Sequence, residues 1–79
     1  METTVKKISE LKCNKEIDNS RVEAIIENFK MFGQKNPIPI DRDNNVIDGE
    51  NRYMAYRKLG IKSVQCLKLT AEEMKLLLK

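Results

Sequence analysis

Three glycines, at positions 33, 49 and 60, divide this chain into short segments and limit the elements it can form. Apolar residues recur at helical spacing before Gly33 and before Gly60, whereas a strand-like pattern precedes Gly49 and follows Gly60. Glycine suits these ends because it adopts the left-handed conformation that closes many helices and turns. A chain of 79 residues has room for one core, so we expect a single domain over residues 1–79.

Two helices are predicted from capping residues and apolar spacing. The first runs over Ser20–Phe32, because the preceding run Asp18–Ser20 offers three N-caps and apolar residues follow every three or four positions. The second runs over Glu50–Leu59 and stops at Gly60. Its apolar positions predict a buried face made of Tyr53 or Met54, Ala55 and Leu59.

A third helix is predicted at the C-terminus. Thr70 and Glu73 have the spacing of a capping box, which opens a helix over Ala71–Leu78. The leucine-rich end from Met74 to Leu78 has no stop signal. We therefore expect either a natural chain that is longer than this one, or a protein partner or self-association through this helix.

Strand-like segments lie between the helices. Pro39 limits one of them to a short or edge strand, and the turn-forming run Asp41–Asn45 joins it to the next as a hairpin. The expected strands are Thr4–Ile8, Ile38–Ile40, Val46–Ile47 and Lys62–Leu69. The order strand, helix, strand, strand, helix, strand, helix predicts an α+β (α/β-like) fold, with a small mixed sheet and flanking helices.

Charge and composition exclude several classes of protein. The formal net charge is +3, from 15 basic and 12 acidic residues, which permits a nucleotide or nucleic-acid partner but is low for a dedicated nucleic-acid binder. Cys13 and Cys66 lie far apart and there is no histidine, so we expect thiols rather than a zinc site. No signal peptide or membrane span is recognisable, and we expect a cytoplasmic protein.

The segment Val46–Gly60 carries the clearest functional pattern. A strand that ends in Gly49 and turns at once into a helix leaves the first N–H groups of that helix unpaired, and the helix dipole makes this end positive. Anions bind at such ends. Gly49 would let a phosphate approach the backbone, and Arg52 could offer a two-pronged guanidinium to its oxygens. A structural alternative stays open, in which Gly49 only makes a turn and Arg52 pairs with Glu50 or Asp48.

A wider pattern surrounds this segment. Gly33–Ile40, the hairpin, Val46–Ala55, Leu59–Ile61 and Val64 follow in an order and spacing that resembles the N-terminal domain of the ParB/sulfiredoxin superfamily. The resemblance covers the chain from about Val5 to Leu69. It implies a fold that binds nucleotide phosphates at the start of the motif helix, with CTP or ATP and Mg²⁺ as cofactors. The implied phosphate- and nucleotide-binding residues are Gly49, Glu50, Asn51 and Arg52.

The branches of this superfamily differ at the motif. The partition proteins usually read Gly-Glu-Arg-Arg, so that Gly49, Glu50 and Arg52 match and Asn51 departs. Their proline- and arginine-containing segment before the first helix is replaced by Cys13–Glu16. Sulfiredoxins need a cysteine beside the motif glycine, where this chain has Glu50. The resemblance therefore implies a ParB-like nuclease or partition-type domain and not a sulfinic-acid reductase.

Weaker candidates surround the motif. Asp48 and Glu50 are Mg²⁺ candidates, although a turn carboxylate and a helix-dipole partner are the simpler interpretations. Glu16, Asp48 and Glu50 are the only catalytic candidates. Tyr53 and Tyr56 could stack on a base, although helical spacing favours a core position for at least one.

Two functions remain. The first is a module that binds nucleotide or DNA phosphate, in a plasmid, phage or chromosome partition or regulatory system. The alternative is a Mg²⁺-dependent enzyme of the same superfamily: a nucleotide hydrolase, a nuclease or a free-amino-acid kinase. The absence of histidine and of a clear base favours binding over catalysis.

Overall fold

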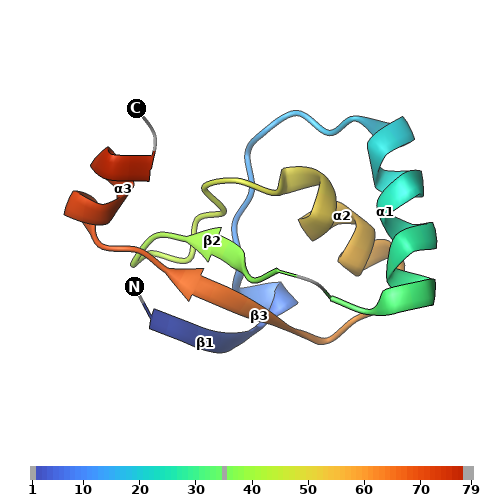
Figure 1. Ribbon diagram of the computed structural model, residues 1–79, viewed down its shortest axis with the longest axis horizontal. Helices are drawn as coiled ribbons and strands as arrows, with labels where there is room; N and C mark the ends of the chain where they lie inside the picture. Colours follow the sequence, from blue (N-terminus) through green and yellow to red (C-terminus); the bar gives the residue numbers. More distant parts are fainter. Residues whose placement is uncertain (1, 35, 78–79) are drawn as a thin grey trace.

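A three-stranded mixed sheet organises the protein, as seen in a computed structural model that describes residues 2–34 and 36–77 (Figure 1). The strand β3 (Ser63–Lys68) is central, with β1 (Glu2–Lys7) antiparallel on one side and β2 (Ile38–Ile40) parallel on the other. The strong alternation of the segment after Gly60 thus marks the central strand, and β2, which was predicted to be a short or edge strand, is at an edge. The α+β fold with a small mixed sheet is confirmed.

The predicted hairpin after β2 forms, but the strand predicted at Val46–Ile47 is reduced to a single bridge. Val46 forms an antiparallel bridge with Ile40, in which the Ile47 N–H donates to the Pro39 carbonyl at 2.9 Å and the Asp41 N–H donates to the Asn45 carbonyl at 3.0 Å. On its other side, the Val46 N–H donates to the Lys12 carbonyl at 2.8 Å. The chain bends at Asp48, directly after Ile47, so the pairing does not continue as a ladder. The motif helix is therefore preceded by an irregular extended segment.

Three α-helices follow the predicted capping signals. The helix α1 (Asn19–Phe32) has Asp18 as its N-cap, and α2 (Glu50–Lys58) begins after Gly49. In front of α3 (Ala71–Leu77), the Thr70 N–H donates to Glu73 Oε1 and the Glu73 N–H donates to Thr70 Oγ1, both at 3.1 Å. These reciprocal bonds confirm the capping box. A short 3₁₀ turn, η1 (Ile8–Glu10), follows β1, where the sequence predicted one more strand residue.

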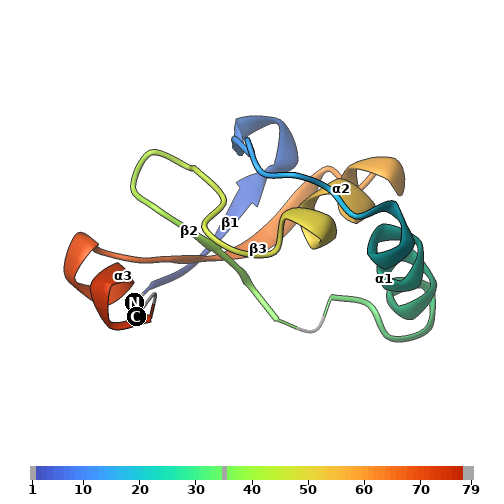
Figure 2. The same cartoon turned by 90° about the horizontal axis from the view of Figure 1, so that it is seen from above.

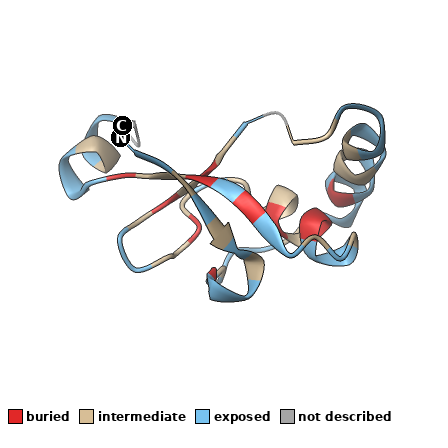
Figure 3. Cartoon of the chain, turned by 90° about the horizontal axis from the view of Figure 1, so that it is seen from below, coloured by how far each residue is buried: buried red, intermediate tan, exposed pale blue. Residues whose placement is uncertain are grey.

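The helices α1 and α2 lie in layers on one side of the sheet, whereas α3 lies at the other end of the molecule (Figure 1). Figure 2 shows α2 between the sheet and α1, and the main contacts of α1 are with α2. Buried side chains gather on β2, β3 and the inner face of α2, whereas α3 has no fully buried side chain among those described (Figure 3). The core residues of the sheet and helices are Ile38, Ile40, Val64, Cys66, Tyr53, Ala55, Tyr56 and Val22. The isoleucine and valine side chains among them each contribute roughly 1.5–3 kcal/mol when they are fully buried.

Core positions on α2 differ in part from those predicted. Tyr53 and Ala55 are buried as expected, but the third buried position is Tyr56 rather than Leu59, which is only half-buried. Tyr56 lies under Phe29 of α1, with the two ring centroids 5.3 Å apart. Long-range packing of α1 on α2 therefore buries both tyrosines.

Other sequence predictions concern the thiols and the chain ends. Cys66 is buried and Cys13 is half-buried, both as free thiols, and burial raises the pKa of Cys66. The side chain of Leu76 on α3 is 74% exposed, and Leu78 of the predicted leucine-rich end lies outside the described residues. Over the described part of the chain, the helices are all too short or too polar to cross a bilayer.

Candidate functional site at the start of α2

Gly49 adopts a backbone conformation that other residues rarely reach. Its φ is 92° and its ψ is 32°, in the left-handed region, and it is the N-cap residue of α2. Its N–H bonds to the carboxylate of Asp48 at 2.9 Å, and within the described chain no side chain caps the helix. The sequence prediction of a glycine turn that leads into a helix is thus confirmed. The amides of the first turn of α2 remain available to an anion.

The guanidinium of Arg52 lies directly over Gly49. A Cβ built on Gly49 would be 3.0 Å from Arg52 Nη2 and 3.1 Å from Nε. The same guanidinium donates from Nη1 to the Asn36 carbonyl at 2.8 Å. No ion pair joins Arg52 to Asp48 or Glu50 in the described structure. The structural alternative of an Arg52 ion pair is therefore wrong, and the space that a side chain at Gly49 would fill is taken by the Arg52 guanidinium.

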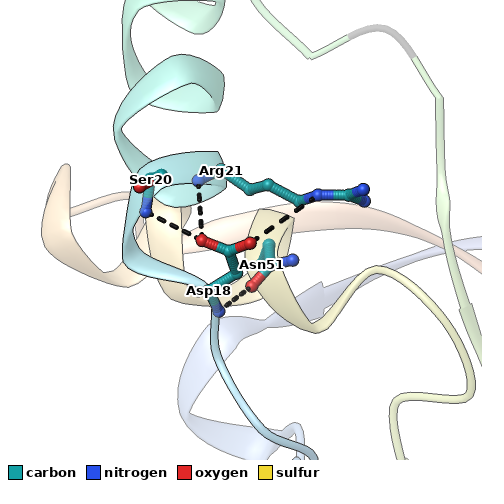
Figure 4. A network of polar contacts seen from close by, with 4 residues as sticks. All are labelled: Asp18, Ser20, Arg21 and Asn51. Atoms are coloured by element: carbon teal, nitrogen blue, oxygen red, sulfur yellow. Dashed lines mark hydrogen bonds and ion pairs between the residues drawn. The ribbon is translucent and has the colours of Figure 1, made fainter.

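Asn51 ties the start of α2 to the start of α1. Its Oδ1 accepts a hydrogen bond from the Asp18 N–H at 2.8 Å, while the Asp18 carboxylate accepts from the N–H groups of Ser20 and Arg21 at 3.0 and 3.4 Å (Figure 4). The Nε of Arg21 lies 3.9 Å from Asp18 Oδ2. The protein thus orients the Asn51 side chain through its oxygen, and the amino group is the donor that it can offer to a ligand.

Two further cations reach this region, and sequence reasoning missed both. Arg21, whose side chain is 76% exposed, lines a hollow of about 210 Å³ together with Gly49, Glu50 and Arg52. The amine of Lys15 donates to the carbonyl of Ile47, just before Asp48. The sequence did contain one indication for Arg21. A cation in the first turn of a helix is unfavourable beside the positive end of the helix dipole, so its presence there calls for another explanation.

A second hollow adjoins the first. It has a volume of about 350 Å³ and lies between α1, α2 and the chain after Gly33. Arg52 and Ile25 line both hollows, so the guanidinium marks their boundary. The second hollow is the more apolar of the two, and its walls include Ala24, Phe29, Gly33 and Tyr56. The start of α2 therefore combines a polar end with an apolar side chamber.

The two tyrosines predicted for base stacking are both buried. Tyr53 is 6% and Tyr56 is 3% exposed, so most of each ring contacts the core. Tyr53 accepts a hydrogen bond from Arg57 at 3.3 Å, whereas Tyr56 lines the apolar hollow. Burial raises the pKa of Tyr56, and the Arg52 guanidinium beside its hydroxyl offsets part of this rise. Of the two, only Tyr56 is in position to contact a ligand there.

The carboxylates near the site are spread over two hollows. Glu50 lines both the polar hollow, with Asp48, and a shallower one of about 380 Å³, with Glu16 and Asn51. Within residues 2–34 and 36–77, no three acidic, histidine or cysteine side chains are grouped to hold a metal. Asp48 and Glu50 could contribute oxygen ligands only beside a phosphate that supplies others.

Known proteins share the fold of this chain. No family model and no curated protein matches the sequence. Among solved structures, a pNOB8-like ParB N-domain superposes with a TM-score of 0.74 and 30% identity, over 85% of this chain and 29% of that one. Sulfiredoxin from Arabidopsis thaliana superposes with a TM-score of 0.77 and 18% identity, over 100% of this chain and 99% of that one. C-terminally truncated ParB from Caulobacter crescentus, in complex with CTP-gamma-S, superposes with a TM-score of 0.78 and 17% identity. The match covers 98% of this chain and 49% of that one. The chain thus spans less than a third of the first of these proteins and about half of the third.

Proposed function

Since this chain has the ParB/sulfiredoxin superfamily fold, we propose that it is a nucleotide-binding module that holds the phosphates of CTP or ATP at the start of α2. The observation that carries the proposal is the position of Arg52, whose guanidinium lies over the left-handed Gly49 and between two adjoining hollows. An arginine in that place can contact a phosphate in the polar hollow while the nucleoside occupies the apolar hollow.

The phosphate end is supported by donors from several segments. The first-turn amides of α2 and the Arg52 guanidinium both favour an anion. Arg21 and Lys15 bring two more positive charges from α1 and from the loop before it. Lys15 and Arg21 could replace the arginine-containing segment that the resemblance implies and this sequence lacks. Such convergence suits the several negative charges of a di- or triphosphate better than a single phosphate.

The nucleoside end is supported by the size and walls of the apolar hollow. Its volume of about 350 Å³ is within the range of small-molecule sites, roughly 300–1,000 Å³. Phe29 and Tyr56 form an aromatic corner in it. We assign Tyr56 as the residue that contacts the base, whereas Tyr53 serves the core. Asp48 and Glu50, which line the polar hollow, would contact a Mg²⁺ ion that the phosphates bring with them.

A second candidate is a Mg²⁺-dependent enzyme of the same superfamily, a nucleotide hydrolase, nuclease or free-amino-acid kinase. The observation that favours it is the hollow shared by Glu16, Glu50 and Asn51, which places an exposed carboxylate beside the proposed phosphate site. In this case Glu16 would accept a proton from the attacking hydroxyl. DNA phosphate is the alternative ligand for the same helix end, and a partition or regulatory system is the setting we propose for either function.

Calorimetric titration of CTP, ATP and ADP with Mg²⁺ tests the binding proposal. We expect one of them to bind the wild-type protein, and Arg52→Ala to weaken binding at least tenfold, because the guanidinium contacts the phosphates directly. Arg57→Ala removes an arginine five residues along the same helix and should leave the affinity unchanged. If all three nucleotides fail to bind, or if both variants bind equally, the proposal is wrong.

Release of phosphate in the same samples would select the enzyme over the binding module. Loss of that release in Glu16→Gln would assign Glu16 as the base.

A further inference from the structure

Gln34, the residue after the C-cap of α1, forms three hydrogen bonds with the backbone through its side-chain amide. Its Oε1 accepts from the Gln65 N–H at 3.1 Å, and its Nε2 donates to the Gln65 carbonyl at 3.0 Å and to the Asn36 carbonyl at 3.1 Å. The reverse orientation of the amide would point its amino group at an N–H and its oxygen at two carbonyls. The three contacts therefore fix one orientation of this side chain.

The Gln34 amide takes the place of a strand residue beside β3. In the described structure, β2 pairs with β3 only from Cys66 to Lys68. The Leu69 N–H donates to the Ile40 carbonyl of β2 at 2.9 Å. Because a strand alternates with a period of two, Gln65 directs its N–H and C=O to the same side as Leu69, one step beyond the end of β2. The Gln34 side chain thus fastens the chain after α1 to the central strand of the sheet.

The carbonyl of Asn36 is an acceptor that Gln34 and Arg52 share. Arg52 Nη1 donates to it at 2.8 Å and Gln34 Nε2 donates to it at 3.1 Å. A carbonyl oxygen has two lone pairs, so it can accept both bonds at once. Pro37 follows in the sequence and restricts the Asn36 backbone to extended conformations. Gln34 and Pro37 together hold the carbonyl that Arg52 contacts.

The bond at Nη1 determines which edge of the Arg52 guanidinium can meet an anion. The Nε and Nη2 atoms are at another edge, and a Cβ built on Gly49 would be 3.1 and 3.0 Å from them. The guanidinium is planar and rigid, so a bond that holds Nη1 limits the directions of the other two nitrogens. A pair of guanidinium N–H groups matches two oxygens of a phosphate. The edge over Gly49 is therefore the one that would bind.

We propose that Gln34 is a positioning residue that directs Arg52 toward the phosphates, through the carbonyl that the two side chains share. This role rests on the proposed function, in which Arg52 contacts the phosphates. An arginine that is ordered before binding loses less conformational entropy when the ligand arrives. In the structural alternative, Gln34 only fastens the chain to β3, and its removal would lower stability without an effect on Arg52.

Nitrogen relaxation of the Arg52 Nε–H group in the ligand-free protein tests the positioning without a nucleotide. Gln34→Ala should lower the heteronuclear NOE of this group, and Gln34→Met, which keeps the length of the side chain but not its amide, should do the same. Gln65→Ala is the matched control. It removes an exposed glutamine side chain, whereas the bonds of Gln65 to Gln34 come from its backbone. This control should leave the Arg52 signal unchanged.

A double-mutant cycle in nucleotide titrations tests whether Gln34 acts through Arg52. With CTP or ATP and Mg²⁺, Gln34→Ala should weaken binding by about threefold to tenfold, the effect of one more side chain that has to be ordered on binding. In the Arg52→Ala background the same change should have almost no effect, because the residue that Gln34 positions is missing. Gln65→Ala should bind as the wild type does.

Two results would overturn the role of Gln34. One is an unchanged Arg52 Nε–H signal in both Gln34 variants, and the other is an equal loss of affinity from Gln34→Ala with and without Arg52. If the wild type binds none of the nucleotides, the proposed function is wrong, whereas the relaxation measurement still decides whether Gln34 orders Arg52.

Discussion

At the scale of single residues, Gly49 and Arg52 form one unit. The backbone of Gly49 is in the left-handed region, and the absence of a side chain there provides the space in which the Arg52 guanidinium lies. The two residues are three positions apart on one helical turn, so local sequence alone could predict that they meet. The hydrogen bond from Arg52 to the Asn36 carbonyl could not be predicted, because it joins segments 16 residues apart.

Substituting alanine at two glycines separates backbone strain from function. Gly49 has φ 92° and Gly60 has φ 76°, so each alanine should lower the free energy of unfolding by about 1–2 kcal/mol in urea titrations. A Cβ at Gly60 meets nothing within 4 Å, whereas at Gly49 it meets Arg52. We therefore expect only Gly49→Ala to weaken nucleotide binding. Equal nucleotide affinities for the two variants would contradict the proposed role of this glycine.

At the scale of elements, the starts of α1 and α2 are joined through Asp18 and Asn51. Removal of an N-cap side chain costs about 1 kcal/mol. Asp18→Ala should lower the free energy of unfolding by about that amount, and Asn51→Ala should lower it by a similar amount because the Asp18 N–H loses its partner. Glu23→Ala, at an exposed position in the interior of α1, is the control. If neither Asp18→Ala nor Asn51→Ala is less stable than this control, the two helix starts are not joined as described.

The turn after β2 should make stability depend on pH. Slight burial tends to raise the pKa of Asp41, but hydrogen bonds from Asn45 and Asp43 outweigh it, so this pKa is lower in the folded protein than its ordinary value of 3.8. A lowered folded-state pKa contributes stability above pH 3.8, which is lost as the pH falls through the folded value. Asp41→Asn should be less stable than wild type at pH 7, and the difference should shrink below pH 3.8. A difference that is constant from pH 7 to pH 3 would contradict this.

Elements whose signals are local were predictable, whereas those that depend on distant partners were not. The Asp18 cap, the Thr70–Glu73 box and the alternation of β3 follow from neighbours in sequence. Val46 was expected in a strand, but its N–H bonds to Lys12, 34 positions away. The positions of Arg21 and Lys15 near Gly49 depend on how distant segments pack together, which the local sequence does not indicate.

At the scale of the whole molecule, α2 joins the candidate site to the core. Its start carries the candidate nucleotide site, and the core lies between the helix and the sheet (Figure 2). The helix α3 lies away from this arrangement and has Leu76 exposed. We retain as a proposal that this end binds a protein partner or a second copy. If it does, sedimentation should show Leu76→Ser to be less associated than wild type, and equal association would exclude Leu76 from the contact.

The central claim is that a nucleotide binds at the start of α2, and amide chemical shifts test it most directly. On addition of Mg²⁺ with CTP or ATP, the amide resonances of residues 49–53 should move together with those of the apolar hollow around Phe29. The shifts should disappear in Arg52→Ala and persist in Arg57→Ala. If no nucleotide moves these amides, or if Arg52→Ala responds as the wild type does, the start of α2 is a structural turn and not a nucleotide site.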